Sequence, residues 1–441
     1  MEISSLTFLY IFLPAALLLF RIAPAKFRGA VLAAISTGFV LLSEPEHFVF
    51  LTGETVILYF LSEAMFRFSE NSKKKKAIFF AALFLNVSSM IVFSVRSQLE
   101  GGFAPFAAMV VSFTAIGYFV DLYKDETDPI RSFADFAVFL VFFGKLARGP
   151  LIRAKDFREL SGTVKPDLSE TGGGIYLFIR GLAKYTVLSL PLASLRESLF
   201  AANSEEISVI GAWLDMVVFS MMIFFDLSGF CDMARGLGKC FGIELPKNFY
   251  FPFQSPSVSD FLDRFNMTVT AFFRHYVYDV LRNDKNSRPQ FIVNTVLISM
   301  LCGIWFGIRM NFIFWGLYIA AFIIIEEFFL RRFLKKIPHF FARIYTFVVT
   351  MFSMVIFSAS DIDSILISYK AMFGIGADMI TDSVTYIVSQ NMLVLIGGAF
   401  FLISAFSMLI RRISKKSPGL FSFFAVIESA VLLVLITAEL L

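Results

Sequence analysis

The sequence predicts an all-helical integral membrane protein that crosses the bilayer many times. The mean hydropathy is +0.75. Hydrophobic residues make up 57% of the chain, and charged residues only 17%. An average soluble domain carries about a quarter charged and roughly half apolar residues. Apolar runs close to the ~20 residues that cross a bilayer recur along the whole chain. These observations leave little room for a soluble domain.

The apolar runs define the expected transmembrane helices. They cover residues 6–24, 28–43, 47–66, 77–95, 103–122, 132–147, 173–195, 208–230, 290–308, 311–330, 342–359, 390–410 and 419–440. Several runs are short or polar, so we expect roughly 11 to 13 transmembrane or re-entrant helices. No repeat or low-complexity linker divides the chain, and residues 1–441 are therefore predicted to form a single membrane domain.

Basic clusters predict the orientation of these helices, because short cytoplasmic loops are enriched in Lys and Arg. The clusters are Arg21, Lys26 and Arg28; Lys73 to Lys76; Arg331, Arg332, Lys335 and Lys336; and Arg411, Arg412, Lys415 and Lys416. Even numbers of predicted spans separate the first cluster from the second and the third from the fourth. If all four clusters are cytoplasmic, both termini and the acidic loop 360–389 lie outside.

Several function classes are disfavoured by composition and motifs. The formal net charge of +4 is too small to indicate nucleic-acid binding. Cys231, Cys240 and Cys302 have no metal-ligand spacing, and we expect no metal site. The chain has no GxSxG motif, phosphate-binding P-loop or HExxH motif. An ion-coupled transporter would be expected to show inverted repeats, and we detect none.

Residues 144–184 form a basic segment that is too polar to span and too apolar to be a free loop. Its basic residues are Lys145, Arg148, Arg153, Lys155, Arg158, Lys165, Arg180 and Lys184. We expect it to lie along the cytoplasmic face of the membrane. Lys145, Arg148 and Arg153 would then form a basic surface. Such a surface either anchors anionic lipid headgroups or binds a phosphate-bearing donor.

A second group of charges lies where a membrane helix is expected, within residues 224–282. A charge at the centre of a membrane helix costs about 2.5–3.5 kcal/mol on insertion scales, and such residues mark function by default. Asp232 and Arg235 are three positions apart, so we interpret them as a structural ion pair. The remaining group favours a polar funnel within the helix bundle. It contains Asp263, Arg264, Arg274 and His275.

A third feature is the polar break from Trp305 to Asn311, between two apolar runs. It predicts either a tight helical hairpin or a hairpin tip that dips into a cavity. Arg309 favours the second interpretation, because non-helical backbone at membrane depth is tolerated where it lines a cavity.

Long motifs in these regions resemble the membrane-bound O-acyltransferase (MBOAT) family, especially its bacterial branch that acts on alginate and teichoic acid. The resemblance covers about residues 104–375, with 1–103 and 376–441 as peripheral helices. The motifs are SFTAIGYFVDLYK (112–124), FFGKLARGPLIRAKDF (142–157), GIYLFIRGLAKYTVL (174–188), FFDLSGFCDMARGLGKCFGIELPKNFYFPF (224–253), DFLDRFNMTVTAFFRHYVYDVL (260–281), GIWFGIRMNFIFWGLYIA (303–320) and FSMVIFSASDIDSILISYKAMFG (352–374).

The resemblance implies a ring of helices around a central funnel in the bacterial cell membrane. A thioester donor, either an acyl carrier protein or coenzyme A, would approach from the cytoplasm. Its acyl group would pass to a hydroxyl of an extracytoplasmic polysaccharide or teichoic acid, with envelope proteins as further partners. No tightly bound cofactor is implied. Asp263, Arg264, Asn266, Arg274, Trp305, Phe306 and Arg309 would bind substrate.

This sequence departs from the family at both histidine positions. The family has a histidine on the hairpin, in a Trp-His-Gly setting, and a second one in the Asp-Phe-Trp-x-Arg-Trp-His stretch. Here these positions hold Phe306 and Asn266. Phenylalanine cannot accept a proton from an alcohol. His275 is the only histidine within the polar segment. It is therefore the candidate general base, although helix geometry turns it about 180° from position 266.

Two hypotheses of different classes follow. The first is an O-acyltransferase whose general base is His275 or another group. The second is a catalytically inactive relative that binds a ligand, forms a channel or recruits partners in a cell-envelope system. Loss of both family histidines favours the second hypothesis, whereas retention of the surrounding motif favours continued ligand binding.

Overall fold

A computed structural model describes residues 1–99, 106–161, 167–205, 208–278, 287–402 and 417–441, and nearly all of the ordered elements in these ranges are helices. Within the same ranges the β contacts are isolated bridges, between Ser208 and Asp378 and between Phe249 and Phe265. Lys165 and the predicted basic cluster at 411–416 lie outside the described residues. The polytopic, all-helical prediction is confirmed.

Among the described residues, nine helices are long and apolar enough to cross a membrane. A tenth candidate is formed by α20 (Asp382–Gln390) and α21 (Met392–Leu402), which meet at a bend of 67°. Two shorter apolar helices, Phe8–Ile22 and Arg288–Ile304, complete the set. Roughly 11 to 13 transmembrane or re-entrant helices were expected, so the structure agrees with the predicted architecture.

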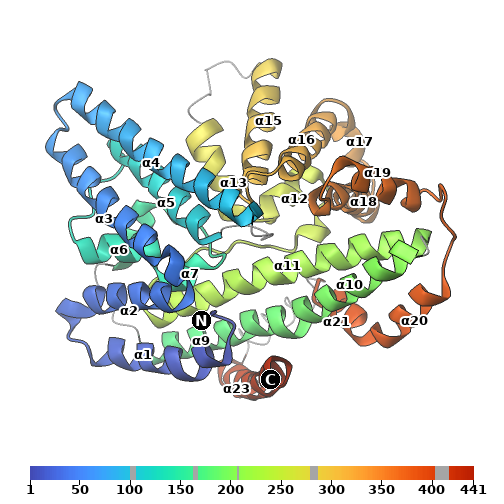
Figure 1. Cartoon of the computed structure of the whole chain (residues 1–441), viewed down its shortest axis with the longest axis horizontal. Coiled ribbons are helices and arrows are strands. Elements are labelled where there is room, and N and C mark those ends of the chain that lie inside the picture. Colours follow the sequence, from blue (N-terminus) through green and yellow to red (C-terminus); the bar gives the residue numbers. More distant parts are fainter. Residues whose placement is uncertain (100–105, 162–166, 206–207, 279–286, 403–416) are drawn as a thin grey trace. The chain divides into compact units, whose positions relative to one another are not determined.

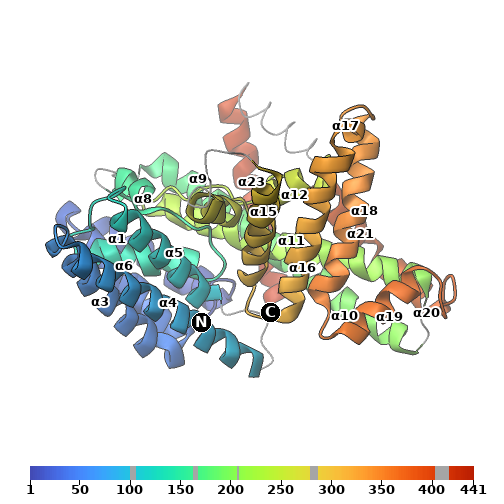
Figure 2. The same ribbon diagram turned by 90° about the horizontal axis from the view of Figure 1, so that it is seen from above.

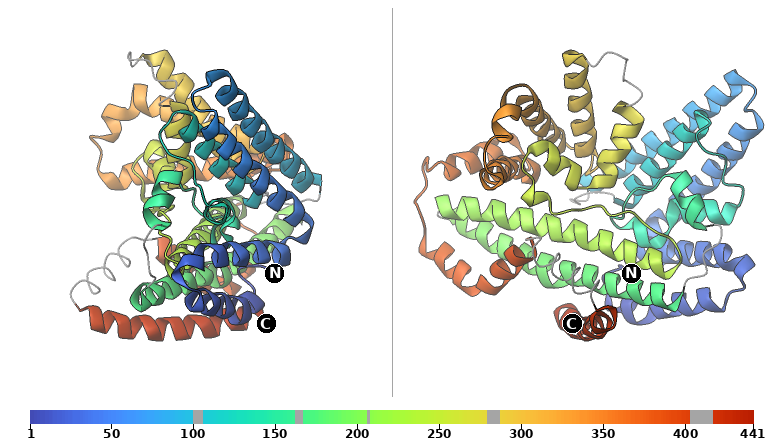
Figure 3. Two further views of the ribbon diagram at one scale, coloured as in Figure 1. Left: turned by 90° about the vertical axis from the view of Figure 1, so that its left-hand side faces the viewer. Right: turned by 180° about the vertical axis from the view of Figure 1, so that it is seen from behind.

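The chain divides into two compact units. Unit 1 comprises Met1–Leu182, Phe230–Lys247 and Leu440–Leu441. It contains η1 (Phe8–Phe12), α1 (Leu13–Ile22), η2 (Ala25–Phe27), α2 (Arg28–Ser43), α3 (Pro45–Arg67), α4 (Ser72–Leu99), α5 (Phe106–Tyr123), α6 (Phe133–Val141), α7 (Phe143–Leu146), α8 (Ala154–Ser161) and α9 (Leu168–Ala183). Figures 1 and 3 show α3 and α4 side by side. Phenylalanine rings fill the spaces between helices, as where Phe8 and Phe39 meet edge to face at 5.7 Å.

Unit 2 comprises Ala183–Gly229 and Asn248–Glu439. It contains η3 (Lys184–Ser189), α10 (Leu190–Glu205), most of α11 (Val209–Cys240), η4 (Pro252–Gln254), α12 (Val258–Arg264), α13 (Met267–Phe273), η5 (Arg274–Tyr278), α15 (Arg288–Ile304), α16 (Met310–Ile325), η6 (Glu326–Leu330), α17 (Arg331–Leu334), α18 (His339–Ser358), α19 (Ile362–Met372), α20, α21 and α23 (Pro418–Leu440). Figures 1 and 2 show α15 beside α16.

Two glycines allow α15 and α16 to form a close antiparallel pair. A Cβ atom at Gly303 would lie 2.1 Å from the Phe312 carbonyl oxygen, and one at Gly316 would lie 2.4 Å from the Ser299 oxygen. Neither contact is sterically feasible, so a side chain at either position would force the helices apart. Small residues at such crossings are typical of membrane helix pairs. The break at 305–311 is therefore the turn of a tight helical hairpin, and the entry of its tip into a substrate cavity stays a prediction.

Three local predictions need correction. Residues 132–147 do not form one span, because the helix breaks at Phe142 between α6 and α7. Segment 144–184 is not wholly interfacial, because a continuous helix from Leu168 to Ala202 qualifies as a candidate span. Lys73 to Lys76 belong to the first turns of α4 and not to a loop, and Lys75 is only 8% exposed because it pairs with Asp125 at 2.7 Å.

Candidate functional site

The predicted site residues of the polar segment lie on α12, at the N-cap of α13 and on η5. Two acceptors fix the first turn of α12. Ser257 Oγ accepts a hydrogen bond from Asp260 N at 3.1 Å. The Glu326 carboxylate accepts hydrogen bonds from Val258 N at 2.7 Å and from Ser259 N at 3.2 Å. These N–H groups have no partner within the helix, and a carboxylate suits the positive end of its dipole. Glu326 thereby anchors α12 to η6.

Asn266 lies between α12 and α13, and its backbone is in the left-handed region with φ 58° and ψ 52°. Asn248 Nδ2 donates a hydrogen bond to Asn266 Oδ1 at 2.7 Å. Asn248 Oδ1 accepts from both Thr268 N and Thr268 Oγ1 at 2.8 Å, and the Asn248 carbonyl accepts from Met267 N at 2.8 Å. Asn266 is 6% exposed and Asn248 is 3% exposed. Asparagine adopts this conformation more readily than most residues, so Asn266 suits its place.

Phe306 lies at the tip of the α15–α16 hairpin and is 1% exposed. Its ring packs against three other aromatic rings, with centroid distances of 5.0 Å to Phe357, 6.0 Å to Phe312 and 6.2 Å to Trp315. The edge-to-face geometry toward Phe357 and Trp315 is a favourable aromatic arrangement. Phe306 is therefore enclosed by aromatic rings. Among these ring partners the indole N–H of Trp315 is polar, and it donates a hydrogen bond to Ser353 Oγ at 3.2 Å.

The other residues of the hairpin tip also have defined positions in the fold. Trp305 is 3% exposed. Gly307 has φ 128°, which residues with a side chain rarely adopt. Arg309 is the N-cap residue of α16, is half-buried, and places its guanidinium carbon 6.0 Å from the centre of the Phe312 ring. The substrate-binding roles of Trp305, Phe306 and Arg309 stay predictions.

The charged residues near Asn266 form two ion pairs. Arg274 pairs with Asp263 at 2.7 Å, and these side chains are 52% and 40% exposed. Arg264 pairs with Asp260 at 2.8 Å, one helical turn earlier. Asp232 and Arg235 also pair, at 3.1 Å, which confirms the expected structural pair in α11. The substrate-binding roles of Asp263, Arg264, Asn266 and Arg274 stay predictions.

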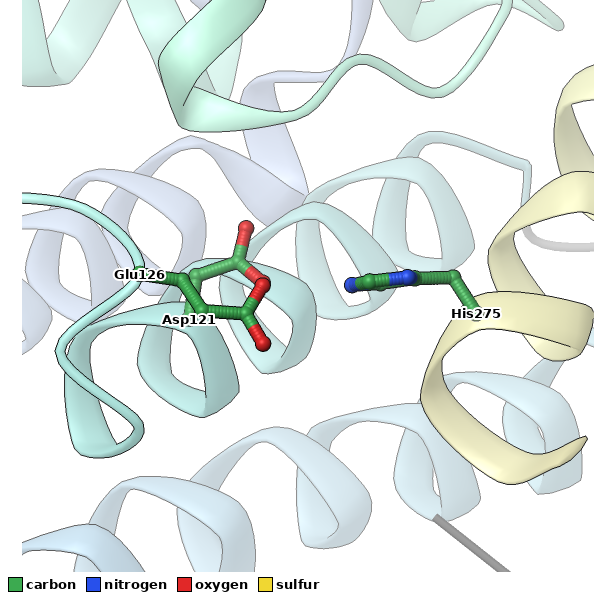
Figure 4. Close-up of side chains that lie close together, drawn as sticks. All are labelled: Asp121, Glu126 and His275. Carbon is green, nitrogen blue, oxygen red and sulfur yellow. The ribbon is translucent and has the colours of Figure 1, made fainter. Parts of the chain in front are cut away.

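His275 lies on η5 (Figure 4) and is half-buried. Its ring centroid is 4.8 Å from that of Tyr276 in an edge-to-face contact. His275 comes two residues after the end of α13, within the polar segment that the sequence predicted. Its catalytic role stays a prediction. In the same unit, α13 packs against α15 where Thr270 Oγ1 lies 4.0 Å from Cys302 Sγ.

In unit 1, Lys145 and Arg148 are enclosed by aromatic side chains. Lys145 is 1% exposed, and its ammonium donates a hydrogen bond to the Phe139 carbonyl. The Arg148 guanidinium carbon lies 4.4 Å from the centre of the Phe230 ring and 5.1 Å from that of Phe106. Lys145 therefore does not lie on an open basic surface, although a donor-binding role for these residues stays a prediction.

Arg153 is also engaged within unit 1. It donates to both carboxylate oxygens of Asp121, at 3.0 and 3.2 Å, and to Glu126 Oε2 at 2.9 Å. Figure 4 shows the two acidic side chains close together. Asp121 is 1% exposed, so this is the bidentate pairing expected of an arginine that compensates a buried carboxylate. Arg153 is therefore paired with acidic side chains of its own unit, and its role in binding a donor stays a prediction.

Sequence reasoning did not identify Asn248 or Glu326 as part of this site. Asn248 lies 18 positions before Asn266, and nothing in the spacing predicts their contact. Glu326 carried a usable signal, because a carboxylate inside the apolar run 310–334 needs a partner. Only the fold, however, identifies the N-terminus of α12 as that partner.

Comparisons with known proteins match most of the chain. It is 26% identical over 400 residues to the probable alginate O-acetylase AlgI of Azotobacter vinelandii, covering 87% of this chain and 80% of the relative. It is 25% identical over 418 residues to the peptidoglycan O-acetyltransferase of Helicobacter pylori, covering 83% and 79%. It is 30% identical over 211 residues to the teichoic acid D-alanyltransferase of Bacillus subtilis, covering 43% and 51%.

The sequence model of the membrane-bound O-acyltransferase family matches residues 55–369. The match begins well before the core boundary of 104 expected from the motifs, so α3 and α4 belong to the family region. It includes α12, α13 and the hairpin with Phe306 at its tip. With well over half of its length matched, and an all-helical polytopic structure, this chain belongs to the membrane-bound O-acyltransferase family.

Proposed function

We propose that this multi-pass membrane protein acts in the O-acylation of a cell-envelope polymer. An acyl group would leave a thioester donor on the cytoplasmic side, carried by an acyl carrier protein or coenzyme A. It would pass to a hydroxyl of an extracytoplasmic polysaccharide or teichoic acid. The observation that carries this proposal is the similarity to acyltransferases named for three envelope polymers, which extends over 83% or more of this chain for two of them.

In this proposal, His275 takes the proton of the acceptor hydroxyl while that oxygen attacks the thioester carbonyl carbon. The thiolate leaves with the electron pair of the broken carbon–sulfur bond. An alcohol is a poor nucleophile near neutral pH, so such a base typically contributes about 10²–10⁴-fold. His275 is the only histidine in the polar segment, whereas His47 and His339 lie at the first turns of α3 and α18.

A second candidate function is supported by the site itself. Position 306 is enclosed by aromatic rings, and position 266 is held by hydrogen bonds to Asn248. At neither position is there an unfilled space of the kind that a missing histidine side chain would leave. This observation favours a non-catalytic relative that serves a cell-envelope modification system as a ligand-binding, channel or scaffold subunit.

Replacing His275 with Ala separates the two candidates. The assay measures acyl release from the isolated envelope polymer of cells that express the parent, His275→Ala or the control His339→Ala, each at equal membrane abundance. An acyltransferase that uses His275 loses about 10²-fold or more of its turnover in His275→Ala alone. Equal polymer acylation in all three would exclude His275 as the general base, and it is the result expected of a non-catalytic subunit.

Restoring both family histidines gives the complementary test. The double variant Asn266→His with Phe306→His rebuilds the pair in this fold. Imidazole is smaller than phenyl, so overpacking is not expected at 306, although an unpaired buried ring nitrogen costs about 1–3 kcal/mol. Gain of polymer acylation over an inactive parent would show an intact transfer path that lacks only its base. A folded double variant without activity would support the scaffold function.

The predicted orientation has its own test, because all donor chemistry is assigned to the cytoplasmic side. Single cysteines at Glu2, Lys74 and Ile380, which are exposed side chains, report on the N-terminus, the second basic cluster and the acidic loop. The native cysteines are buried, so background labelling is expected to be low. With a membrane-impermeant thiol reagent on intact cells, we expect labelling at 2 and 380. Labelling at 74 would overturn the orientation.

A further inference from the structure

A cavity of about 820 Å³ lies in unit 2, lined by residues from the start of α15 and from the η6–α17 turn. Figures 1 and 2 show the helices α15 and α17. The cavity volume is in the range of small-molecule sites. Its lining includes three arginines, Arg288, Arg331 and Arg332, and two aromatic rings, those of Phe291 and Phe328. It contains none of the residues assigned above to acyl transfer, so the inference drawn from it does not depend on that proposed function.

The charge of this cavity is positive. Arg331 pairs with Glu327, the only lining carboxylate among the described residues. Arg288 lies over the Phe328 ring, at 5.6 Å from its centre, and Arg332 is exposed. Ser287, the N-cap residue of α15, makes no capping hydrogen bond through its side chain. The positive end of the α15 dipole therefore adds to two arginines that no carboxylate among the described lining residues balances.

Asn294 is the second and independent sign of a ligand. Its side chain lines the cavity one and a half turns into α15, and the residue is only 2% exposed. Asn294 Oδ1 has no hydrogen-bond partner in the protein. This oxygen is itself enclosed, and a rotation of the Asn294 amide brings it to the cavity that the residue lines. Buried polar atoms are almost always hydrogen-bonded, so a ligand in the cavity can supply the donor that the protein does not.

We propose that this cavity binds a phosphate ester that also carries a hydroxyl or amide hydrogen-bond donor. Arg288 and Arg332 bind the phosphate oxygens through charge-assisted bonds, for which the planar guanidinium is well suited. Asn294 Oδ1 accepts the ligand's hydrogen bond, and Phe291 and Phe328 contact its carbon skeleton. Arg331 and Arg332 follow the apolar part of the candidate span Met310–Leu334, at the level where lipid headgroups are expected. A headgroup such as phosphoglycerol and a soluble ester such as glycerol phosphate share this chemistry.

The first experiment tests the arginines. The full-length protein, solubilised in neutral detergent, is titrated with phosphatidylglycerol, and bound lipid is counted by native mass spectrometry. Arg288→Gln with Arg332→Gln is compared with Lys335→Gln with Lys336→Gln, which removes the same charge from two residues outside the cavity lining. We expect the arginine variant to bind about 10-fold more weakly or worse, and the lysine variant to change less than about 3-fold. Equal losses in both variants would overturn a built site in favour of diffuse attraction.

The second experiment tests Asn294 and the source of the ligand. Phosphatidylmethanol has the same charge as phosphatidylglycerol but no headgroup hydroxyl. The parent should prefer phosphatidylglycerol, and Asn294→Leu should abolish that preference without weakening phosphatidylmethanol binding. If Asn294→Leu does not fold, Asn294→Ser is used as the test variant in its place. Displacement of bound lipid by millimolar glycerol 1-phosphate assigns the site to soluble esters, and retention assigns it to lipid. Equal affinity of the parent for both lipids would overturn the role of Asn294.

Discussion

The motif resemblance matches positions 266 and 306 to the two family histidines, yet the surroundings of these positions in this protein are opposite in character. Asn266 lies at a polar corner, where Asn248 donates to its side chain and accepts bonds from Thr268. Phe306 lies in an apolar cluster formed by Phe312, Trp315 and Phe357. Both positions are more than nine-tenths buried. The difference is therefore one of polarity and not of access to solvent.

This comparison shows that the two replacements are not equivalent losses. An amide at 266 keeps a hydrogen-bonding group where the family has an imidazole, and its partner Asn248 is in place. A phenyl ring at 306 removes the hydrogen-bonding group and completes an aromatic cluster. A histidine restored at 266 would find a partner, whereas one restored at 306 would be desolvated among rings. Position 306 is thus the more committed to a structural role.

The largest effect is expected where the cluster itself is broken. Phe306→Ala leaves a cavity between Phe312, Trp315 and Phe357, so it should destabilise the protein by about 3–5 kcal/mol. The measurement is the free energy of unfolding in bicelles. Phe329→Ala is the matched control, because Phe329 is 77% exposed and should cost well under 1 kcal/mol. Similar losses in both variants would show that position 306 is not tightly packed.

The same contrast explains how much of this protein could be predicted from its sequence. Hydropathy predicts the helices, because a bilayer imposes their length and apolarity. Asp232 and Arg235 were identified as a pair, because three residues on a helix place them together. The motif located positions 266 and 306 but not their partners. Asn248 and Phe357 lie 18 and 51 positions away from them, and only the fold brings such distant residues together.

The basic segment shows a second limit of sequence reasoning. Its arginines and lysines resemble an anion-binding surface, but Arg153 is matched by Asp121 and Lys145 is enclosed. The Asp121 carboxylate lies 32 positions earlier, on another helix. Charge counts along a segment cannot show whether a distant carboxylate already neutralises it. The cavity at Arg288 and Arg332 was overlooked for the converse reason, since its residues come from two separate stretches.

An intermediate effect is expected at the polar position. Asn248→Ala removes the donor to Asn266 Oδ1 and the acceptor of Thr268 N, so it should destabilise the protein by about 2–3 kcal/mol. Asn266→Gly removes the contact between positions 248 and 266 without straining the backbone at φ 58° and keeps the acceptor of Thr268, so a smaller loss is expected. Unfolding in bicelles measures both. Equal losses would mean that the Asn266 contact contributes most of the effect.

The smallest effect isolates the backbone at position 266. Asn266→Ala and Asn266→Gly both lose the side-chain hydrogen bond, so their difference reports on conformation alone. Because φ is 58° there, alanine should be about 1 kcal/mol less stable than glycine. Position 271, an exposed alanine within α13, supplies the control, since Ala271→Gly should be destabilising by about 0.5–1 kcal/mol. Opposite signs of the alanine-to-glycine change at 266 and 271 would confirm the left-handed corner. If glycine is less stable than alanine at both positions, the backbone at 266 relaxes into the helical conformation. Positions 266 and 306 would then differ only in how their side chains are packed.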